Sequence, residues 1–344
     1  MIEPQSREII SRVMSRYGAS CSPEEFHAAV NVTFHNFESE VYDQLHSDMW
    51  TSLPQQFALL VDDCIREHRG LPEKIRVLDV GAGTGLASDC LLRTALGPRI
   101  TSIDLIDTSQ SMLEQATRRA SRWNVPVRPH AGLIGGVPEG DRYELIVTCS
   151  VLHHVPDLKE FCSQVRRHQL PGGIFLHLQD PNTEFMAKRK LETGGRTQTR
   201  LLQQLARFTP KRIGGRIARE LAGTQGEDYI SKTNRALIQS GVVTAPLRIE
   251  DLFSITDIHV LDERGISIDA MRQWLPDYEC LSQRSYVFFG KLRSELPARM
   301  QAKEDELCRE KASGGAEIAA VWCLRAANQR QGASPAGTSL KRMC

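Results

Sequence analysis

Short apolar runs alternate with helix-like stretches through the middle of the chain. The runs are IRVLDV (75–80), ITSIDLID (100–107), VPVRPH (125–130), YELIVTCS (143–150) and GIFLHLQ (173–179). They are continuous rather than alternating with polar residues, which is typical of parallel strands covered by helices on both faces of a sheet. The pattern predicts a doubly wound α/β domain that has five strands by Gln179.

Helical spacing marks the segment before this domain. One amphipathic helix is predicted between Ser22 and Trp50, because apolar residues recur there at steps of three, four and four. These residues are Phe34, Phe37, Val41 and Leu45. A second helical stretch, PQQFALLVDDCIREHRG, is predicted to end with Gly70 at its C′ position.

The alternation breaks after Thr183. Apolar residues at helical spacing predict a helical insertion of roughly 70 residues, placed over the sheet edge where ligands bind. These positions are Leu201, Leu202, Leu205, Phe208, Ile213, Ile217 and Leu221. The alternation returns with IDAMRQWL (268–275) as a helix, and YECLSQRSYVFF (278–289) and AEIAAVWCLRA (316–326) as two further strands.

Composition and charge exclude few classes of function. The chain has 344 residues, 41% of them hydrophobic, and a formal net charge of +1, so its overall charge favours no polyanionic partner. Between Pro181 and Arg219, however, ten basic residues stand against two acidic ones. The nine cysteines form no C-x-x-C pair and show no zinc-ligand spacing. With no signal-peptide pattern and no apolar run of about 18 residues, we expect a cytoplasmic protein without a metal or a membrane segment.

A glycine-rich stretch, VLDVGAGTG (77–85), follows the first predicted strand, where open α/β sheets bind cofactors. Gly81, Gly83 and Gly85 form G-x-G-x-G, whereas a dinucleotide site needs its third glycine one position later, where this chain has Leu86. No Gly-Lys-Ser/Thr follows, which excludes a P-loop. Asp107 ends the second strand, where its carboxylate can accept hydrogen bonds from both hydroxyls of a ribose. The pattern predicts a nucleoside ligand without a pyrophosphate.

Four stretches in order carry a family resemblance: VLDVGAGTG, DTSQSML (107–113), YELIVTCSVLHHVPD (143–157) and LPGG (170–173). In these motifs the chain resembles the class I S-adenosylmethionine-dependent methyltransferases, especially the bacterial group that acts on small molecules. The resemblance covers Val77 to Asp180 and implies S-adenosylmethionine as the cofactor. With the other apolar runs, it implies a Rossmann-like, mostly parallel sheet of seven strands, with N-terminal helices and a helical insertion after the fifth strand.

The predicted units follow from these patterns. They are an N-terminal helical segment or lid (1–72), an S-adenosylmethionine-binding core (73–182), a basic helical insertion or cap (183–255), a C-terminal completion of the core sheet (256–327) and a tail of disordered composition (328–344).

The resemblance also implies roles for single residues. The three glycines of the loop would face the methionine and ribose portions of the cofactor, and Asp107 would bind the ribose hydroxyls. Met112 would flank the adenine, and Cys149 and Ser150 would approach the sulfonium together with Val151. Asp79 would reach the ammonium group through water or backbone. The full predicted set is Asp79, Gly81, Ala82, Gly83, Gly85, Asp107, Thr108, Met112, Cys149 and Ser150.

One position departs from the family pattern. After the third strand the family usually offers an acidic residue to the adenine amino group, whereas this chain has His130 and Ala131 there. Backbone carbonyls or apolar contacts from Leu133 would hold the adenine instead.

Catalytic residues are harder to predict, because an in-line displacement needs a base only when the acceptor must lose a proton. His154 or His153, after the fourth strand, is a candidate base; the alternative is that the pair caps the next helix and packs against the sheet. Three residues spaced by four would share one helix face, either as a lid touching the substrate or as core packing: Tyr42, His46 and Trp50. His177 and Asp180 end the fifth strand on the ligand side, where Asp180 followed by Pro181 could equally be a strand-terminating turn. Weaker candidates are His259 and Tyr286.

The leading hypothesis is methyl transfer to oxygen, nitrogen or carbon of a small organic acceptor beneath the insertion, by a monomer or homodimer. The basic stretch raises an alternative with RNA or protein as acceptor, although only Phe185 and Phe208 are available there to stack on bases. A third hypothesis is a non-catalytic S-adenosylmethionine-binding scaffold. The glycine spacing disfavours a nicotinamide oxidoreductase.

Overall fold

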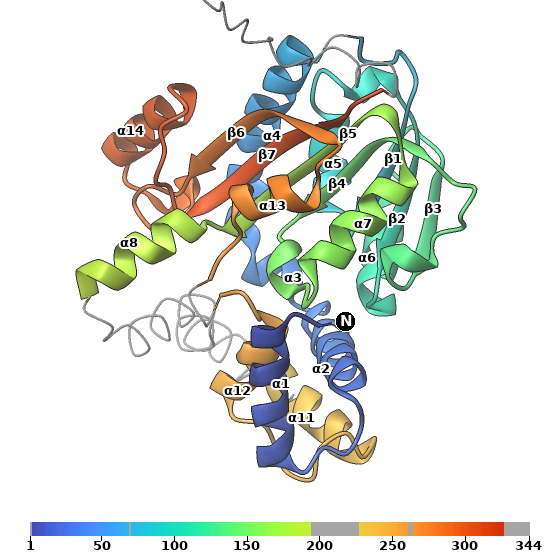
Figure 1. Ribbon diagram of the computed structural model, residues 1–344, viewed down its shortest axis with the longest axis vertical. Coiled ribbons are helices and arrows are strands. Elements are labelled where there is room, and N and C mark those ends of the chain that lie inside the picture. The colour runs from blue at the N-terminus through green and yellow to red at the C-terminus, as the bar shows by residue number, and fades with distance from the viewer. Residues whose placement is uncertain (1, 69, 194–226, 261–263, 327–344) are drawn as a thin grey trace, which may run out of the picture.

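Seven strands form one sheet in the order β3-β2-β1-β4-β5-β7-β6 (Figure 1). The computed structural model describes residues 2–68, 70–193, 227–260 and 264–326. The strands are β1 (Ile75–Val80), β2 (Ile100–Asp107), β3 (Val127–Ala131), β4 (Tyr143–Cys149), β5 (Gln169–Pro181), β6 (Tyr278–Tyr286) and β7 (Glu317–Leu324). Among them only β7 runs antiparallel to its neighbours, β5 and β6. The predicted mostly parallel sheet of seven strands is confirmed.

Helices cover both faces of the sheet. On one face Val77 and Val147 pack against α4 (Ser47–Glu67), α5 (Leu86–Leu92) and α14 (Ala298–Arg309). On the other face Leu78 and Phe175 pack against α7 (Leu158–His168) and α13 (Ile268–Trp274). Successive strand residues point to opposite faces and both faces of the central strands are buried, which explains why apolar residues predominate in these strands.

The remaining short elements connect these layers. Helix α6 (Gln110–Ala120) packs against β2 and β3. Four 3₁₀ turns are η1 (Gly97–Arg99), η2 (Ile134–Gly136), η3 (Leu152–His154) and η4 (Arg293–Glu295). None of the described helices is long and apolar enough to cross a membrane.

The single helix predicted between Ser22 and Trp50 is wrong, because three helices occupy this stretch: α2 (Pro23–Glu38), α3 (Tyr42–Leu45) and the start of α4. Within one helix, residues 38 and 46 would lie about 12 Å apart along the axis. Instead, a carboxylate oxygen of the buried Glu38 lies 3.4 Å from Nε2 of His46. This contact requires the chain to turn back after α2.

Four helices from distant parts of the sequence form a separate lobe below the sheet in the view of Figure 1. We call it the helical lobe: α1 (Pro4–Tyr17), α2, α11 (Tyr229–Gln239) and α12 (Ile249–Thr256). They share an apolar core that includes Ile10, Val13, Phe26, Val30, Phe34, Leu237 and Leu252. Asp251 joins α12 to α1 by accepting hydrogen bonds from Arg16 at 2.7 Å and from the hydroxyl of Tyr17 at 2.7 Å.

Much of the predicted insertion cannot be compared with the structure. Its described residues form α8 (Thr183–Thr193), α11 and α12. Seven of its ten basic residues, its predicted apolar positions from Leu201 to Leu221 and the predicted tail lie outside the described residues.

Candidate functional site

A cavity of about 500 Å³ lies at the carboxyl ends of β1, β2 and β4, with α2 and α3 of the N-terminal region on its opposite side. Of the predicted site residues, three lie outside its lining: Asp79, Gly85 and His153. The others line it: Gly81, Ala82, Gly83, Asp107, Thr108, Met112, Cys149, Ser150 and His154. The parallel strands therefore bring most of the predicted set together at one edge of the sheet.

The glycine loop between β1 and α5 forms one wall of this cavity. The backbone N–H groups of Gly81 and Ala82 donate to the carbonyl of Ile106 at 2.8 and 3.0 Å. A Cβ on Gly81, at φ +68, would lie 2.5 Å from a methyl of Val151, so only glycine fits there. A Cβ on Gly83, at φ +53, would meet no atom closer than 4.0 Å because this glycine borders the cavity.

Gly85 has a different environment. A Cβ at this position would lie 3.2 Å from the ring of Trp123 and 3.4 Å from Cβ of Ala116. Gly85 therefore lets α6 pack closely against the loop and does not border the cavity.

Asp107 links the glycine loop to the start of α6. Its carboxylate accepts the backbone N–H of Gly83 at 2.8 Å and that of Ser109 at 2.8 Å. Burial raises the pKa of Asp107, and these two backbone N–H groups oppose the shift. The side chain is thus held at the cavity wall, in the position where a ribose was predicted.

Asp79 is fully buried beneath the loop. One of its oxygens accepts the hydroxyl of Ser88 at 2.6 Å and the backbone N–H of Ser88 at 3.2 Å. The other oxygen has no hydrogen-bond partner among the described residues. Burial raises the pKa of Asp79 to about 7, so this carboxyl is partly protonated near neutral pH.

The end of β4 contributes a strained backbone. Ser150 has φ +61, a region that non-glycine residues rarely adopt and that often marks functional sites. Its N–H donates to the carbonyl of Leu178 at 2.9 Å, which fixes the turn at the edge of the cavity. Burial raises the pKa of the neighbouring Cys149 thiol well above its usual value, so Cys149 is a neutral wall residue.

The two candidate bases occupy different positions in η3. Nδ1 of His154 lies 2.6 Å from the carbonyl of Thr256, so that nitrogen is the donor and Nε2 is unprotonated. Burial, with the charges of His153 and His35, holds the pKa of His154 well below its usual value. His153 is buried and bonded to Asp180, with Nδ1 and Oδ1 2.8 Å apart. Burial opposes a charge on His153, but the Asp180 contact outweighs it and raises its pKa.

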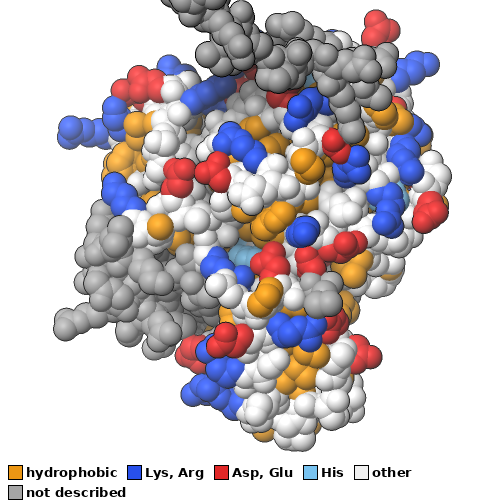
Figure 2. Space-filling view, viewed as in Figure 1, with side chains coloured by type: hydrophobic (Ala, Val, Ile, Leu, Met, Phe, Trp, Pro, Cys, Tyr) orange, Lys and Arg blue, Asp and Glu red, His pale blue; other side chains and the backbone are white. Residues whose placement is uncertain are grey.

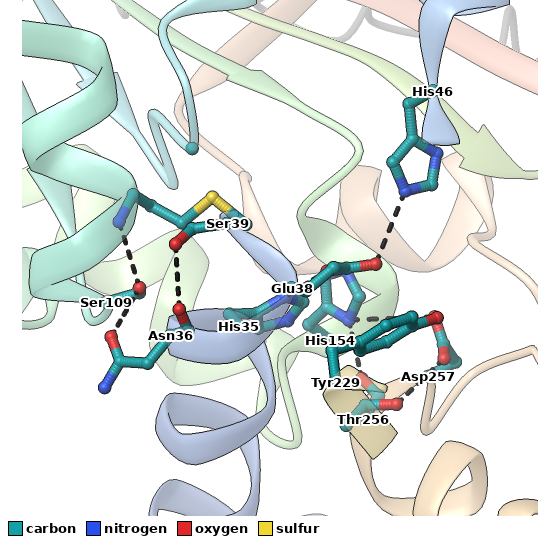
Figure 3. A network of polar contacts seen from close by, with 12 residues as sticks. His35, Asn36, Glu38, Ser39, His46, Ser109, His154, Tyr229, Thr256 and Asp257 are labelled. Carbon is teal, nitrogen blue, oxygen red and sulfur yellow. Dashed lines mark hydrogen bonds and ion pairs between the residues drawn. The ribbon is translucent and has the colours of Figure 1, made fainter. Parts of the chain in front are cut away.

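Helix α2 supplies polar wall residues that the sequence analysis missed. His27, Asn31 and His35 line the cavity from one helix face. Figure 3 shows His35 beside Glu38, with Nδ1 and Oε2 3.0 Å apart, and near His154, whose ring centre is 5.1 Å away. Their spacing of four could have identified them, because it places polar side chains on a single face of a helix.

The Glu38 carboxylate carries charge despite its burial. Burial alone would raise the pKa of Glu38, but hydrogen bonds from His35 and His46 outweigh it and lower that pKa to about 2. In return, Glu38 and more distant Asp107 and Asp257 raise the pKa of His35 against the effect of its own burial.

Three polar contacts, made by Asn36 and Asp43, fasten α2 and α3 over the cavity. Asn36 of α2 accepts the hydroxyl of Ser109 at 2.7 Å (Figure 3). Asp43 of α3 accepts the hydroxyl of Thr84 in the glycine loop at 2.7 Å and also pairs with Arg119. These contacts join the N-terminal helices to the edge of the sheet that carries the glycine loop.

Tyr42, His46 and Trp50 do not share a helix face, because the helix breaks between them. Tyr42 lines the cavity and its ring centre lies 4.3 Å from that of His46. Trp50 lies outside the cavity lining and stacks under Arg119, at 4.0 Å from the guanidinium carbon to the ring centre.

The other candidates, His177, Asp180, His259 and Tyr286, also lie outside the cavity lining. His177 is fully buried, and neither ring nitrogen has a partner among the described residues. His259 contacts the carbonyl of Val155 at 2.7 Å, and the hydroxyl of Tyr286 donates to Gln179 at 3.1 Å. Leu133, in contrast, lines the cavity together with Ile134, on the side where the usual acidic residue is missing.

Known proteins share the central part of this arrangement. Residues 78–175 match a family model described as a methyltransferase domain. A ubiquinone biosynthesis O-methyltransferase from Methylobacterium sp. (strain 4-46) is 32% identical over 134 residues, which is 36% of this chain and 50% of the relative. The highly reducing polyketide synthase valA of Aspergillus terreus is 32% identical over 123 residues, 30% of this chain and 5% of the synthase. The chain thus spans half, or less, of the length of these relatives.

Among solved structures, an S-adenosylmethionine-dependent methyltransferase from Clostridium acetobutylicum ATCC 824 matches with a TM-score of 0.33 and 20% identity, over 39% of this chain and 52% of that chain. The matched stretch thus resembles a methyltransferase domain, and the seven-stranded sheet around it agrees with the resemblance seen in the sequence. The stretch that matches the methyltransferase domain contains the glycine loop, Asp107 and β4.

Proposed function

We propose that this chain transfers the methyl group of S-adenosylmethionine to an oxygen, nitrogen or carbon atom of a small organic acceptor. One observation carries the proposal: a single cavity joins the glycine loop, the Asp107 carboxylate and the strained end of β4. Its volume of about 500 Å³ falls within the range of small-molecule sites, about 300–1,000 Å³.

The cavity wall supports a definite placement of the cofactor. Asp107 would accept the ribose hydroxyls, and Met112 with Leu133 and Ile134 would flank the adenine. Gly83 and the Cys149–Ser150 end of β4 would surround the methionine portion. Asp79 and Gly85, outside the lining, would act indirectly by fixing the start of α5 and the packing of α6.

Methyl transfer requires mainly that the acceptor atom is positioned next to the methyl carbon and that water is excluded. The acceptor attacks the methyl carbon, the carbon–sulfur bond breaks with its electrons on sulfur, and S-adenosylhomocysteine leaves. Helices α2 and α3, fastened by Asn36 and Asp43, cover the cavity and would exclude water from this step. If the acceptor carries a proton, the unprotonated Nε2 of His154 is a candidate to receive it.

Two observations favour a small-molecule acceptor over RNA or protein. Acidic and basic side chains are interspersed over the face shown in Figure 2, which favours a small acceptor over a polyanion on this face. The likeness to an O-methyltransferase that acts in ubiquinone biosynthesis favours it too.

Methyl-labelled cofactor tests the proposal. Full-length chain and its Asp107→Ala variant are incubated with labelled S-adenosylmethionine and cell extract, and small molecules, RNA and protein are separated before mass spectrometry. We expect label in the small-molecule fraction with the wild type and much less with the variant. Label confined to RNA or protein, or cofactor binding without label in any fraction, would contradict the proposed acceptor class.

A further inference from the structure

Three side chains from two distant segments converge beside the cavity: His153 and His154 of η3, and Asp257 after α12. Nε2 of His153 lies 3.6 Å from Oδ1 of Asp257, and Nδ1 of His154 lies 3.8 Å from the same oxygen. One donor atom from each residue lies within 4.8 Å of the other two. Ligand atoms at about 2.0–2.2 Å from a common ion lie roughly 3–4 Å from one another, so small movements would close this set around an ion.

A supporting layer already holds two of the three side chains. Nδ1 of His153 is bonded to Oδ1 of Asp180 at 2.8 Å, which directs the opposite nitrogen toward Asp257. This is the carboxylate–histidine arrangement that commonly stands behind metal ligands. Oδ2 of Asp257 accepts the hydroxyl of Thr256 at 2.9 Å, which leaves Oδ1 facing the two histidines.

Asp180 provides a second, independent observation. It is fully buried, and its Oδ2 has no hydrogen-bond partner among the described residues. A buried carboxylate with an unsatisfied oxygen is costly unless a positive charge lies nearby, which either the neighbouring His153 imidazolium or a bound cation can supply. Asp180 and Asp257 together can balance the two charges of a divalent cation.

The donor set indicates the class of ion. Two imidazoles and one carboxylate suit Zn²⁺ and related transition-metal ions, whereas Mg²⁺ and Ca²⁺ prefer sites built from oxygen atoms. The hydrogen bond from Nδ1 of His154 to the carbonyl of Thr256 would break on binding, because a metal ligand nitrogen cannot keep its proton. Nε2 would then carry the ring proton, so His154 can act as the base only in the ion-free chain.

We propose that His153, His154 and Asp257 bind one divalent transition-metal ion such as Zn²⁺, with Asp180 as a positioning residue. His154 also lines the cavity, so the ion lies next to the space for the acceptor. If the proposed function holds, an ion there favours an acceptor whose oxygen can coordinate it and lose a proton more easily.

Metal titration of the full-length chain tests this site. The chain is stripped with a chelator, titrated with Co²⁺ while its visible absorption is recorded, and titrated with Zn²⁺ by calorimetry. We expect one ion per chain, with cobalt bands typical of nitrogen and oxygen ligands. His153→Ala should abolish binding, Asp257→Asn should weaken it strongly because a ligand loses its charge, and Asp180→Asn should weaken it about 10–100-fold. His130→Ala, a histidine of β3 outside the cluster, is the matched control and should bind as the wild type does.

Three results would overturn the site: no ion bound by the stripped wild type, equal binding by wild type and Asp257→Asn, or a cobalt–thiolate band that assigns the ion to cysteines. If His153→Ala does not fold, the wild-type cobalt spectrum and the isosteric Asp257→Asn variant still decide. Calorimetry with S-adenosylhomocysteine on the same stripped samples separates the two proposals. Failure of the wild type to bind S-adenosylhomocysteine would contradict the proposed function and would leave the metal site unaffected.

Discussion

Alanine at Gly81 and alanine at Gly83 should harm the protein in different ways. Both glycines have positive φ, +68 and +53, so alanine at either costs about 1–2 kcal/mol of backbone strain. At Gly81 the new Cβ would also lie 2.5 Å from one methyl of Val151 and 3.0 Å from the other, which adds about 1–3 kcal/mol of overpacking. At Gly83 the nearest atom is 4.0 Å away, so no such addition arises.

Gly81→Ala should therefore lower the free energy of unfolding by about 2–5 kcal/mol, and Gly83→Ala by only about 1–2 kcal/mol. Gly83→Ala, however, places a methyl in the cavity and should weaken S-adenosylhomocysteine binding at least about tenfold, or about 1.4 kcal/mol. Urea unfolding followed by circular dichroism gives the first quantity, and calorimetry gives the second. The reasoning fails if Gly83→Ala binds like the wild type, or if Gly81→Ala is the more stable of the two.

Three further changes test other parts of the structure. Asp107→Asn should weaken S-adenosylhomocysteine binding at least about tenfold in calorimetry, because the ribose loses a charged acceptor; unchanged affinity would place the ribose elsewhere. Asp63→Ala should lower the free energy of unfolding in urea by about 3–5 kcal/mol, because it leaves the buried Arg284 guanidinium without the carboxylate that lies 2.6 Å from its Nε. The control is Asp269→Ala, which removes an exposed ion pair with Arg272 and should change the free energy of unfolding by less than about 0.5 kcal/mol. The pKa of Asp79 rises from 3.8 to about 7 on folding, so the free energy of unfolding should fall by up to about 4 kcal/mol as the pH rises from about 4 to about 7. Asp79→Asn should remove this dependence of stability on pH. An unchanged dependence in the variant would assign it to other groups.

Most of the sheet was predictable because its central strands are buried on both faces, whereas the edge strand β3 is largely exposed. IRVLDV and ITSIDLID coincide with β1 and β2, in which buried apolar residues predominate although Arg76, Asp79 and Asp104 stand among them. The glycine pattern likewise located the loop, because G-x-G-x-G requires backbone conformations that other residues avoid. Local sequence was sufficient for these features.

The helix break after Glu38 was not predictable from periodicity. Apolar spacing continues through Val41 and Leu45, so the pattern alone extends the helix. What ends it is a tertiary contact, in which buried Glu38 lies between His35 and His46. Periodicity describes one helix face and contains no information about a carboxylate shared between two helices.

Some residues of the cavity wall were predictable from the sequence and others were not. Residues from the sheet edge were found because parallel strands end together, whereas His27, Asn31 and His35 come from a helix whose docking depends on the helical lobe. The neighbours of His153 were out of reach for another reason. Asp257 is more than 100 residues further along the chain, and ligand spacing rules detect only donors close in sequence.

The most direct test of the account is calorimetry with S-adenosylhomocysteine on the full-length wild type and on Asp107→Ala. The account predicts one cofactor bound per wild-type chain and binding at least about tenfold weaker in the variant, at unchanged secondary structure. No heat with the wild type, or equal affinity in both proteins, would contradict the claim that this cavity binds the methyl donor.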